Sequence, residues 1–144
     1  SIPVSSFRDG NKPADWPKDK YSTDYYTDRL LGYLDERGSD DTPFFAYLAY
    51  TAPHWPLQAP KELIEQYKGR YDDGWDALKS KRLERMRELD SRADEYKSVK
   101  APTYVAWDTL SAEEKVVEAR KMEVYAAMVD SMDGNVARVI EKLE

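Results

Sequence analysis

The stretch FFAYLAY (residues 44–50) is the most hydrophobic segment of the chain and decides the predicted fold. Pro43 and Pro53 bound it closely, so it is too short for a typical helix. Its residues do not alternate between apolar and polar types, which is typical of a strand that is buried on both faces in a mostly parallel sheet. The stretch therefore predicts the central strand of an α/β fold.

A helix is expected to begin at Ser22, because the side chain of Ser22 or Thr23 can cap its free amides. Gly38 is expected to end it, since glycine readily adopts the left-handed conformation that closes helices. The apolar face recurs every four residues and consists of Tyr26, Leu30 and Leu34. The sequence thus predicts an amphipathic helix before the strand.

Three further helices are predicted after the strand. Pro60 suits the first turn of a short helix that Gly69 closes, and a second helix covers about residues 75–89. Ser111 and Glu114 form a capping box in front of a long helix. This long helix carries an apolar stripe that is expected to face the core. The stripe consists of Tyr125, Val129, Met132, Val136, Val139 and Leu143.

The composition limits the classes of function. The chain has 144 residues, 41% of them apolar, which is enough for the core of one domain. Its net charge is −6, with acidic and basic residues interspersed, so no nucleic-acid partner is expected. No apolar run reaches the roughly 18–20 residues that cross a bilayer, so no membrane partner is expected. The absence of cysteine excludes disulfides, thiolate metal sites and cysteine nucleophiles, and it leaves the localisation open.

The organisation of the chain predicts a piece of a larger protein. The predicted strand has no identifiable parallel neighbour, and the long helix has no stop signal before Glu144. The chain starts at Ser1 rather than Met, so the sequence is compatible with a leader that has been removed. We therefore expect residues 1–144 to be an internal fragment of an α/β protein.

The only histidine, His54, follows the predicted strand directly, in the sequence YTAPHWP (residues 50–56). In open α/β sheets, ligands bind beyond the carboxyl ends of the strands. Pro53 and Pro56 restrict the loop backbone and so fix the direction of the imidazole. A positioned histidine can donate a hydrogen bond to an oxyanion or move a proton near neutral pH. His54 is therefore the candidate catalytic and substrate-binding residue, and a purely structural loop histidine is the alternative.

Other residues give weaker signals. The acidic pairs Asp40-Asp41 and Asp72-Asp73 can bind a cation, but aspartate is also common in turns. Asp130 and Asp133 lie one helical turn apart, which a partly polar helix side explains better than a ligand site. The sequence contains no glycine-rich phosphate loop, no His-x-x-x-His pair and no nucleophile elbow. No metal ligand is therefore assigned to this chain.

Five stretches of the chain resemble, in the same order, the middle of type I arylsulfatases, and most closely the microbial ones. They are YSTDYYTDRL (21–30), PFFAYL (43–48), APHWPLQAP (52–60), YKGRYD (67–72) and MEVYAAMVDSMD (122–133). The APHWPLQ string carries most of the specificity, and the similarity covers roughly residues 7–144. By this resemblance, residues 1–144 are an internal fragment of a sulfatase catalytic domain.

The resemblance implies a partial alkaline-phosphatase-like α/β/α sandwich and the hydrolysis of sulfate esters, with an aryl sulfate as the leading substrate. It implies a formylglycine nucleophile, made from a Cys or Ser in a C/S-x-P-S-R motif, and a calcium ion that orients the sulfate. In the family, the histidine that follows the Phe-Phe-x-Tyr-Leu strand contacts the sulfate. By resemblance, this role falls on His54.

The chain departs from the family pattern at the nucleophile and at the metal. It contains no C/S-x-P-S-R motif, no paired aspartates before one, and no Asp-Asn calcium motif after the long helix. The formylglycine and the calcium ligands are therefore expected in the rest of the same polypeptide, and the 144-residue chain alone is expected to be inactive. One alternative is a phosphate or phosphonate monoester hydrolase of the same superfamily. Another is a non-catalytic interaction module that uses Trp55 and the proline-rich loop.

Overall fold

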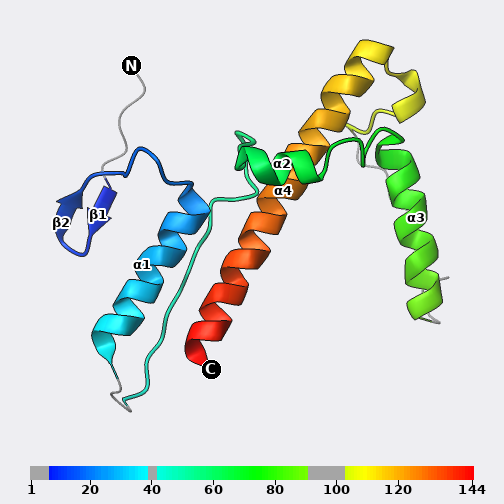
Figure 1. Ribbon diagram of the computed structural model, residues 1–144. Coiled ribbons are helices and arrows are strands. Elements are labelled where there is room, and N and C mark those ends of the chain that lie inside the picture. The colour runs from blue at the N-terminus through cyan, green and yellow to red at the C-terminus, as the bar shows by residue number, and fades with distance from the viewer. Residues whose placement is uncertain (1–6, 39–41, 91–102) are drawn as a thin grey trace.

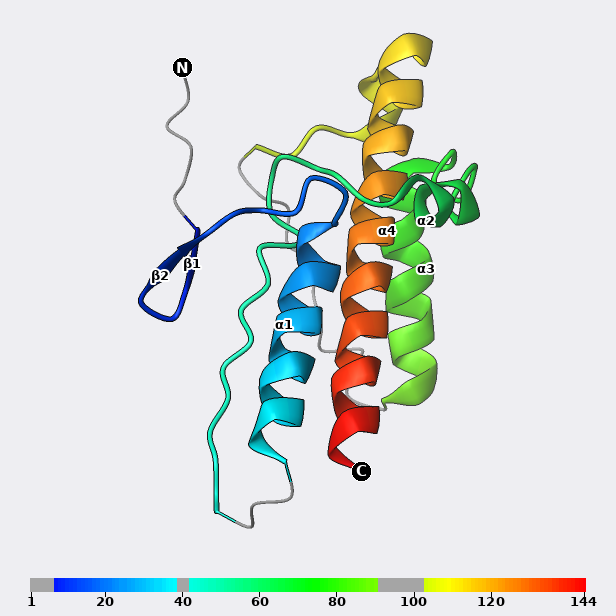
Figure 2. The same cartoon turned by 60° about the vertical axis from the view of Figure 1, so that its left-hand side comes forward.

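A computed structural model of the chain describes residues 7–38, 42–90 and 103–144 (Figure 1). The elements are β1 (Phe7–Asp9), β2 (Lys12–Ala14), α1 (Ser22–Arg37), α2 (Lys61–Gln66), α3 (Gly74–Leu89), the 3₁₀ turn η2 (Trp107–Thr109) and α4 (Ala112–Leu143). The long helix α4 is the central element, because both α1 and α2 pack against it (Figures 1 and 2). Within the described ranges, no helix is both long and apolar enough to cross a membrane.

The N-terminal hairpin is fastened to α1. β1 and β2 pair antiparallel around a turn in which Gly10 has a φ of 58°. Trp16 follows the hairpin and packs edge-on against Tyr25 of α1, with ring centroids 4.9 Å apart. Asp9 of β1 accepts a hydrogen bond from Arg29 of α1 at 2.6 Å. These contacts hold the two-stranded sheet beside α1.

α1 begins and ends where the sequence predicts, but it is capped differently. Its first residue is Ser22, and the N-cap position belongs to Tyr21, whose side chain makes no capping hydrogen bond. The prediction of a Ser or Thr cap is therefore wrong. Gly38 closes the helix at a φ of 66°, which confirms the predicted stop. The predicted apolar face lines a hollow beside residues 44–49.

α1 and α4 are joined by a series of polar contacts. The side-chain amide of Asn135 donates to the Asp24 carboxylate at 2.7 Å. Arg138 donates one hydrogen bond to Asn135 at 2.8 Å and another to Asp28 at 2.6 Å. Lys20 donates to the second oxygen of Asp28 at 2.8 Å. The network fixes the N-terminal half of α1 on α4.

The variant Asp28→Asn is expected to make the chain less sensitive to acid. Hydrogen bonds from Arg138 and Lys20 lower the pKa of the Asp28 carboxyl below its ordinary value of 3.8. A lowered pKa in the folded state adds stability that is present above the unfolded-state pKa and is lost as the pH falls through the folded-state value. Urea unfolding at pH 7 and at about pH 3 should therefore show a smaller loss of stability for Asp28→Asn than for wild type. The exposed Glu36→Gln is the control, and a full wild-type loss in Asp28→Asn would contradict the prediction.

A buried carboxylate holds α2 and the following turn to α4. Glu123 is 5% exposed and accepts a hydrogen bond from the backbone amide of Gly69 at 2.7 Å. Arg120 donates to the same carboxylate at 2.6 Å and reaches Glu65 of α2 at 3.1 Å. The predicted short helix is confirmed over Lys61–Gln66. Pro60 is its N-cap and not a first-turn residue, and Tyr67, not Gly69, is its C-cap, while Gly69 follows at a φ of 74°.

α3 is anchored at its first residues. Gly74 starts the helix at a φ of 78° and lies directly against the buried ring of Trp107. Trp75 packs edge-on against Trp107, with ring centroids 4.8 Å apart, and its indole donates to the Val105 carbonyl at 2.9 Å. Asp76 accepts a hydrogen bond from the backbone amide of Trp107 at 2.9 Å. The predicted helix is confirmed, and further along its length a cavity separates α3 from α4.

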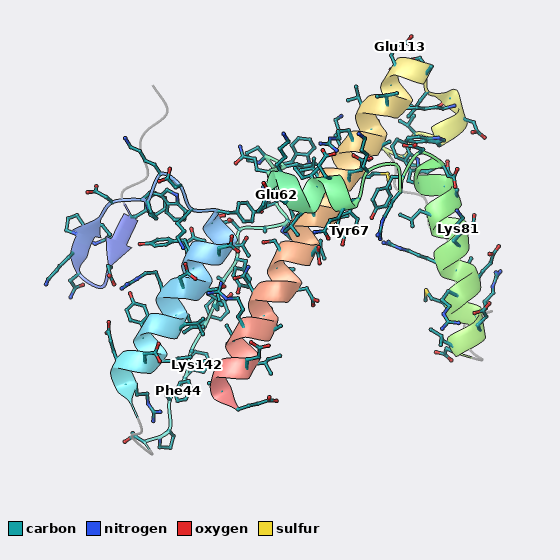
Figure 3. All side chains as sticks on the ribbon, in the orientation of Figure 1. Phe44, Glu62, Tyr67, Lys81, Glu113 and Lys142 are labelled. Carbon is teal, nitrogen blue, oxygen red and sulfur yellow. The ribbon has the colours of Figure 1, made fainter. Side chains whose placement is uncertain are left out.

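Residues 44–50 contradict the prediction of a buried central strand. The segment runs alongside α1 and has no strand partner within the described residues (Figures 1 and 2). Phe45 and Tyr47 are 90% and 83% exposed. Figure 3 shows Phe44 near the C-terminal end of α1, where the Arg37 guanidinium lies 4.7 Å from the ring centroid. The physical reason is that a strand needs neighbours for its amides and carbonyls, and the described residues supply only the β1–β2 pair.

The long helix corrects a second prediction. Its capping box of Ser111 and Glu114 is present, as the sequence predicts. The apolar stripe expected in the core is instead largely exposed, with Tyr125 at 48% and Val136 at 43%. The buried stripe lies on the other side of the helix and consists mostly of small or polar residues, namely Ala119, Glu123, Ala127, Met128, Ser131 and Asn135. Small side chains let α1 and α2 approach closely, and no described element packs tightly over the apolar stripe.

Candidate active site

The loop of residues 51–60 connects the segment 44–50 to α2 and carries His54. The backbone amide of His54 donates to the Thr51 carbonyl at 3.0 Å, so the chain makes a tight turn here. The peptide bonds that precede Pro53 and Pro56 are both cis. The turn and the two prolines together define the backbone around the imidazole.

The hydrogen bond of the His54 ring determines which nitrogen carries the proton. Nδ1 lies 2.7 Å from the carbonyl oxygen of Trp55. A carbonyl oxygen can only accept, so Nδ1 is the donor. In the neutral ring Nε2 is then an acceptor, whereas in the doubly protonated ring it is a donor. The side chain is exposed, so Nε2 can accept a proton from a ligand or, in the charged ring, donate to an anion.

A cavity of about 540 Å³ lies beside His54 and is rich in hydroxyl groups. Its walls come from the start of α1, from the loop and from α4. They consist of Tyr21, Ser22, Tyr50, Thr51, Ala52, His54, Trp55, Pro56, Gln58 and Met128. Hydroxyl groups can donate hydrogen bonds to an anion, and no carboxylate stands among these lining residues to repel one. The lining of the cavity therefore suits an anionic group.

The structure adds four hydroxyl residues that sequence reasoning missed, namely Tyr21, Ser22, Tyr50 and Thr51. The phenols of Tyr21 and Tyr50 are engaged in hydrogen bonds within the chain. The hydroxyls of Ser22 and Thr51 have no hydrogen-bond partner in the part of the chain that the structure describes. Burial raises the pKa of the Tyr21 phenol above its ordinary value. No local sequence signal marks these residues, because the contacts of Tyr21 and Tyr50 join positions far apart in the chain.

The other predicted candidates do not form a second site. Asp73 pairs with Lys81 on the surface at 3.0 Å. Asp130 is half-buried and Asp133 is exposed on α4, while the pair Asp40-Asp41 lies outside the described residues. Within the three described ranges, no group of three or more His, Asp or Glu side chains is placed to hold a metal ion.

A larger cavity of about 790 Å³ lies between α3 and α4 and does not include His54. Its walls are mostly apolar and include Trp75, Met86 and Tyr125, and it shares only Trp55 with the His54 cavity. It adjoins the uncovered apolar stripe of α4 and contains no histidine. We therefore assign the chemistry to the smaller, hydroxyl-lined cavity.

A hydroxyl-lined cavity beside an oriented imidazole suits the binding of an anion, and comparison with known proteins identifies the family. The family model described as Sulfatase matches residues 3–144, so the chain belongs to the sulfatase family. An uncharacterised sulfatase of Schizosaccharomyces pombe is 44% identical over 131 residues, which is 88% of this chain and 23% of that protein. An arylsulfatase of Klebsiella aerogenes is 34% identical over 137 residues, which is 95% of this chain and 29% of that protein.

A more distant match is the multifunctional alkaline phosphatase superfamily protein PehA of Trinickia caryophylli. It is 38% identical over 58 residues, which is 40% of this chain and 11% of that protein. The chain thus spans only about a quarter of the length of the two relatives that match nearly all of it.

Family membership confirms the resemblance that the sequence motifs predict. It also confirms the fold class, a partial alkaline-phosphatase-like α/β fold, of which the described residues show the helices and a small two-stranded sheet. The role of His54 in contacting sulfate is not tested by these comparisons and stays a prediction.

Proposed function

We propose that the chain is part of an enzyme that hydrolyses sulfate esters, with aryl sulfates as the substrate class, and that His54 contacts the sulfate group. The family match over residues 3–144 and the similarity to an arylsulfatase support the reaction class. The single observation that carries the residue assignment is the His54 ring at the edge of a carboxylate-free, hydroxyl-lined cavity.

The residues of this chain would bind the sulfate through hydrogen-bond donors. The Trp55 carbonyl holds Nδ1, so the charged His54 ring presents Nε2–H to a sulfate oxygen. The uncommitted hydroxyls of Ser22 and Thr51 supply two further donors in the same cavity. Donors fixed before the substrate arrives can stabilise charge that develops on the sulfate oxygens during the reaction.

The nucleophile and the metal are proposed to come from outside these 144 residues. The family resemblance implies a formylglycine as the nucleophile and a calcium ion that orients the sulfate. The chain has no cysteine and no C/S-x-P-S-R motif, and the described residues bring no three His, Asp or Glu ligands together. The residues present therefore do not fit either group, and the function of this chain is limited to binding and orienting the substrate.

A phosphate or phosphonate monoester hydrolase is the second candidate, and the similarity to the alkaline phosphatase superfamily protein favours it. The charge of the cavity argues for sulfate. A sulfate monoester carries one negative charge, whereas a phosphate monoester carries about 1.5–2 at neutral pH. His54 is the only side chain among the described lining residues that is able to carry a positive charge. In a polypeptide that also supplies the nucleophile and the metal, 4-nitrophenyl sulfate should therefore be cleaved with a higher kcat/KM than 4-nitrophenyl phosphate.

The purified 144-residue chain is expected to show no turnover of 4-nitrophenyl sulfate. The reason is that a positioned donor can stabilise a transition state, but it cannot replace the missing nucleophile. Release of 4-nitrophenol is measured with and without added calcium, against a buffer blank. Turnover above the blank that His54→Ala abolishes would contradict the assignment of the nucleophile to other parts of the polypeptide.

A further inference from the structure

We propose that Tyr50 and Tyr21 position the His54 loop on α1 and do not themselves bind the substrate. Both phenols line the cavity beside His54, so either one could at first be taken for a substrate ligand. Their hydrogen bonds within the chain decide between the two roles. The relevance of the proposal to catalysis rests on the proposed function, whereas the positioning itself does not.

The phenol of Tyr50 donates its hydrogen to a residue of α1. Its phenol oxygen lies 2.7 Å from Oγ1 of Thr27. The Thr27 hydroxyl has a single hydrogen, and it donates this hydrogen to the Thr23 carbonyl at 3.0 Å. Tyr50 must therefore be the donor in its bond with Thr27. Thr27 is fully buried and Tyr50 is half-buried, so the bond is partly shielded from water.

The phenol of Tyr21 donates its hydrogen to the C-terminal part of the loop. Its phenol donates to the Gln58 carbonyl at 2.7 Å. A tyrosine phenol is protonated at neutral pH, and burial raises the pKa of this one further. Tyr50 precedes the loop and Gln58 lies near its end, so the two bonds hold the loop on either side of His54.

Both bonds involve the N-terminal part of α1, which gives the loop a rigid support. Thr27 belongs to α1 and Tyr21 is its N-cap residue. The same part of α1 is joined to α4 through the Asp24–Asn135 hydrogen bond. Met128 of α4, which is 3% exposed, completes the wall of the cavity. His54 is therefore positioned by contacts of its loop with α1 and α4, and not by the loop alone.

The experiment uses the single histidine as a spectroscopic probe in the 144-residue chain. Ring ¹⁵N signals of His54 are recorded for wild type, Tyr50→Phe, Tyr21→Phe and Thr27→Val, and inorganic sulfate is titrated into each against sodium chloride of equal ionic strength. Tyr47→Phe is the matched control, because Tyr47 is 83% exposed, belongs to the same segment and does not line the cavity. Thermal unfolding of each variant checks that it remains folded.

The proposal expects Tyr50→Phe to change the ring ¹⁵N signals before any sulfate is added, because the Nδ1 bond is no longer held in one geometry. It expects sulfate binding to weaken by about three- to tenfold, as the loss of one hydrogen bond predicts. Tyr50→Phe combined with Thr27→Val should be no worse than Thr27→Val alone, since Thr27→Val already removes the bond to Tyr50. Tyr47→Phe should match wild type in both measurements.

Three results separate the possible failures. The first is that Tyr50→Phe and Tyr21→Phe leave the ring signals unchanged but weaken sulfate binding, and that the effects of Tyr50→Phe and Thr27→Val add. This result would overturn the proposal, because the phenols would then contact the anion directly. Unchanged signals together with unchanged binding would overturn it as well. If wild type shows the fixed ring but no response to sulfate, while Tyr50→Phe releases the ring, the positioning role stands and the proposed function fails.

Discussion

Replacement of His54 by alanine is expected to lower kcat/KM for 4-nitrophenyl sulfate by about 10²- to 10³-fold, the cost of removing one preorganised donor from a site of developing charge. The assay requires a polypeptide that also supplies the nucleophile and the metal. The large effect follows from the geometry of the cavity, in which His54 is the only described lining residue able to carry a positive charge. Its loss leaves only neutral donors to face the sulfate.

Two variants sharpen this test. His54→Gln retains an N–H donor without the charge and should recover part of the lost activity. Lys81→Ala removes a positive charge from the surface pair with Asp73 and should leave kcat/KM unchanged. If His54→Ala keeps wild-type activity, His54 is a structural loop residue and the site assignment is wrong.

Gly74→Ala is expected to lower the free energy of unfolding by about 3 kcal/mol, because it combines backbone strain with overpacking. Gly74 has a φ of 78°, which L-residues rarely adopt. An added Cβ would lie 2.0 Å from Cδ2 of the Trp107 ring. That ring is 5% exposed and packs against Trp75, so it cannot give way without breaking the anchor of α3.

Urea unfolding of the 144-residue chain measures this effect. Gly32→Ala is the matched control, because Gly32 lies inside α1 and an added Cβ meets nothing within 4 Å. Alanine in this helix position should raise stability by about 0.5–1 kcal/mol. Equal stability of Gly74→Ala and Gly32→Ala would show that the contact between Gly74 and Trp107 is not as close as described.

Local signals predicted the helices well. The start of α1 at Ser22, its stop at Gly38 and the capping box at Ser111 and Glu114 all depend on residues within one or two turns of one another. The cap of α1 was the exception, because Tyr21 takes the N-cap position and brings its phenol to the loop instead.

Features that depend on distant partners were predicted poorly. Apolarity marked residues 44–50 and the stripe of α4 as core, but burial also requires an element that covers them. Within the described residues, the only paired strands are β1 and β2, and α1 packs on the small-residue side of α4. A sequence pattern predicts which face of a segment is apolar enough to be buried. It does not predict whether another element of the same chain packs over that face.

The candidate site also contains one residue that local sequence predicted and two that it did not. His54 was predicted because the only histidine of the chain stands between two prolines after an apolar run. Tyr50 and Tyr21 were missed because their hydrogen bonds join residues 23 and 37 positions apart. Such pairings follow from the packing of the loop on α1, which no local pattern records.

The central claim, that His54 faces the sulfate, is tested most directly by titrating inorganic sulfate into the ¹⁵N-histidine-labelled chain. The measurement is made at about pH 6. The account predicts a saturable shift of the Nε2 signal, a smaller change at Nδ1, which stays bonded to the Trp55 carbonyl, and no shift in sodium chloride of equal ionic strength. A ring that responds identically to sulfate and to chloride would contradict it.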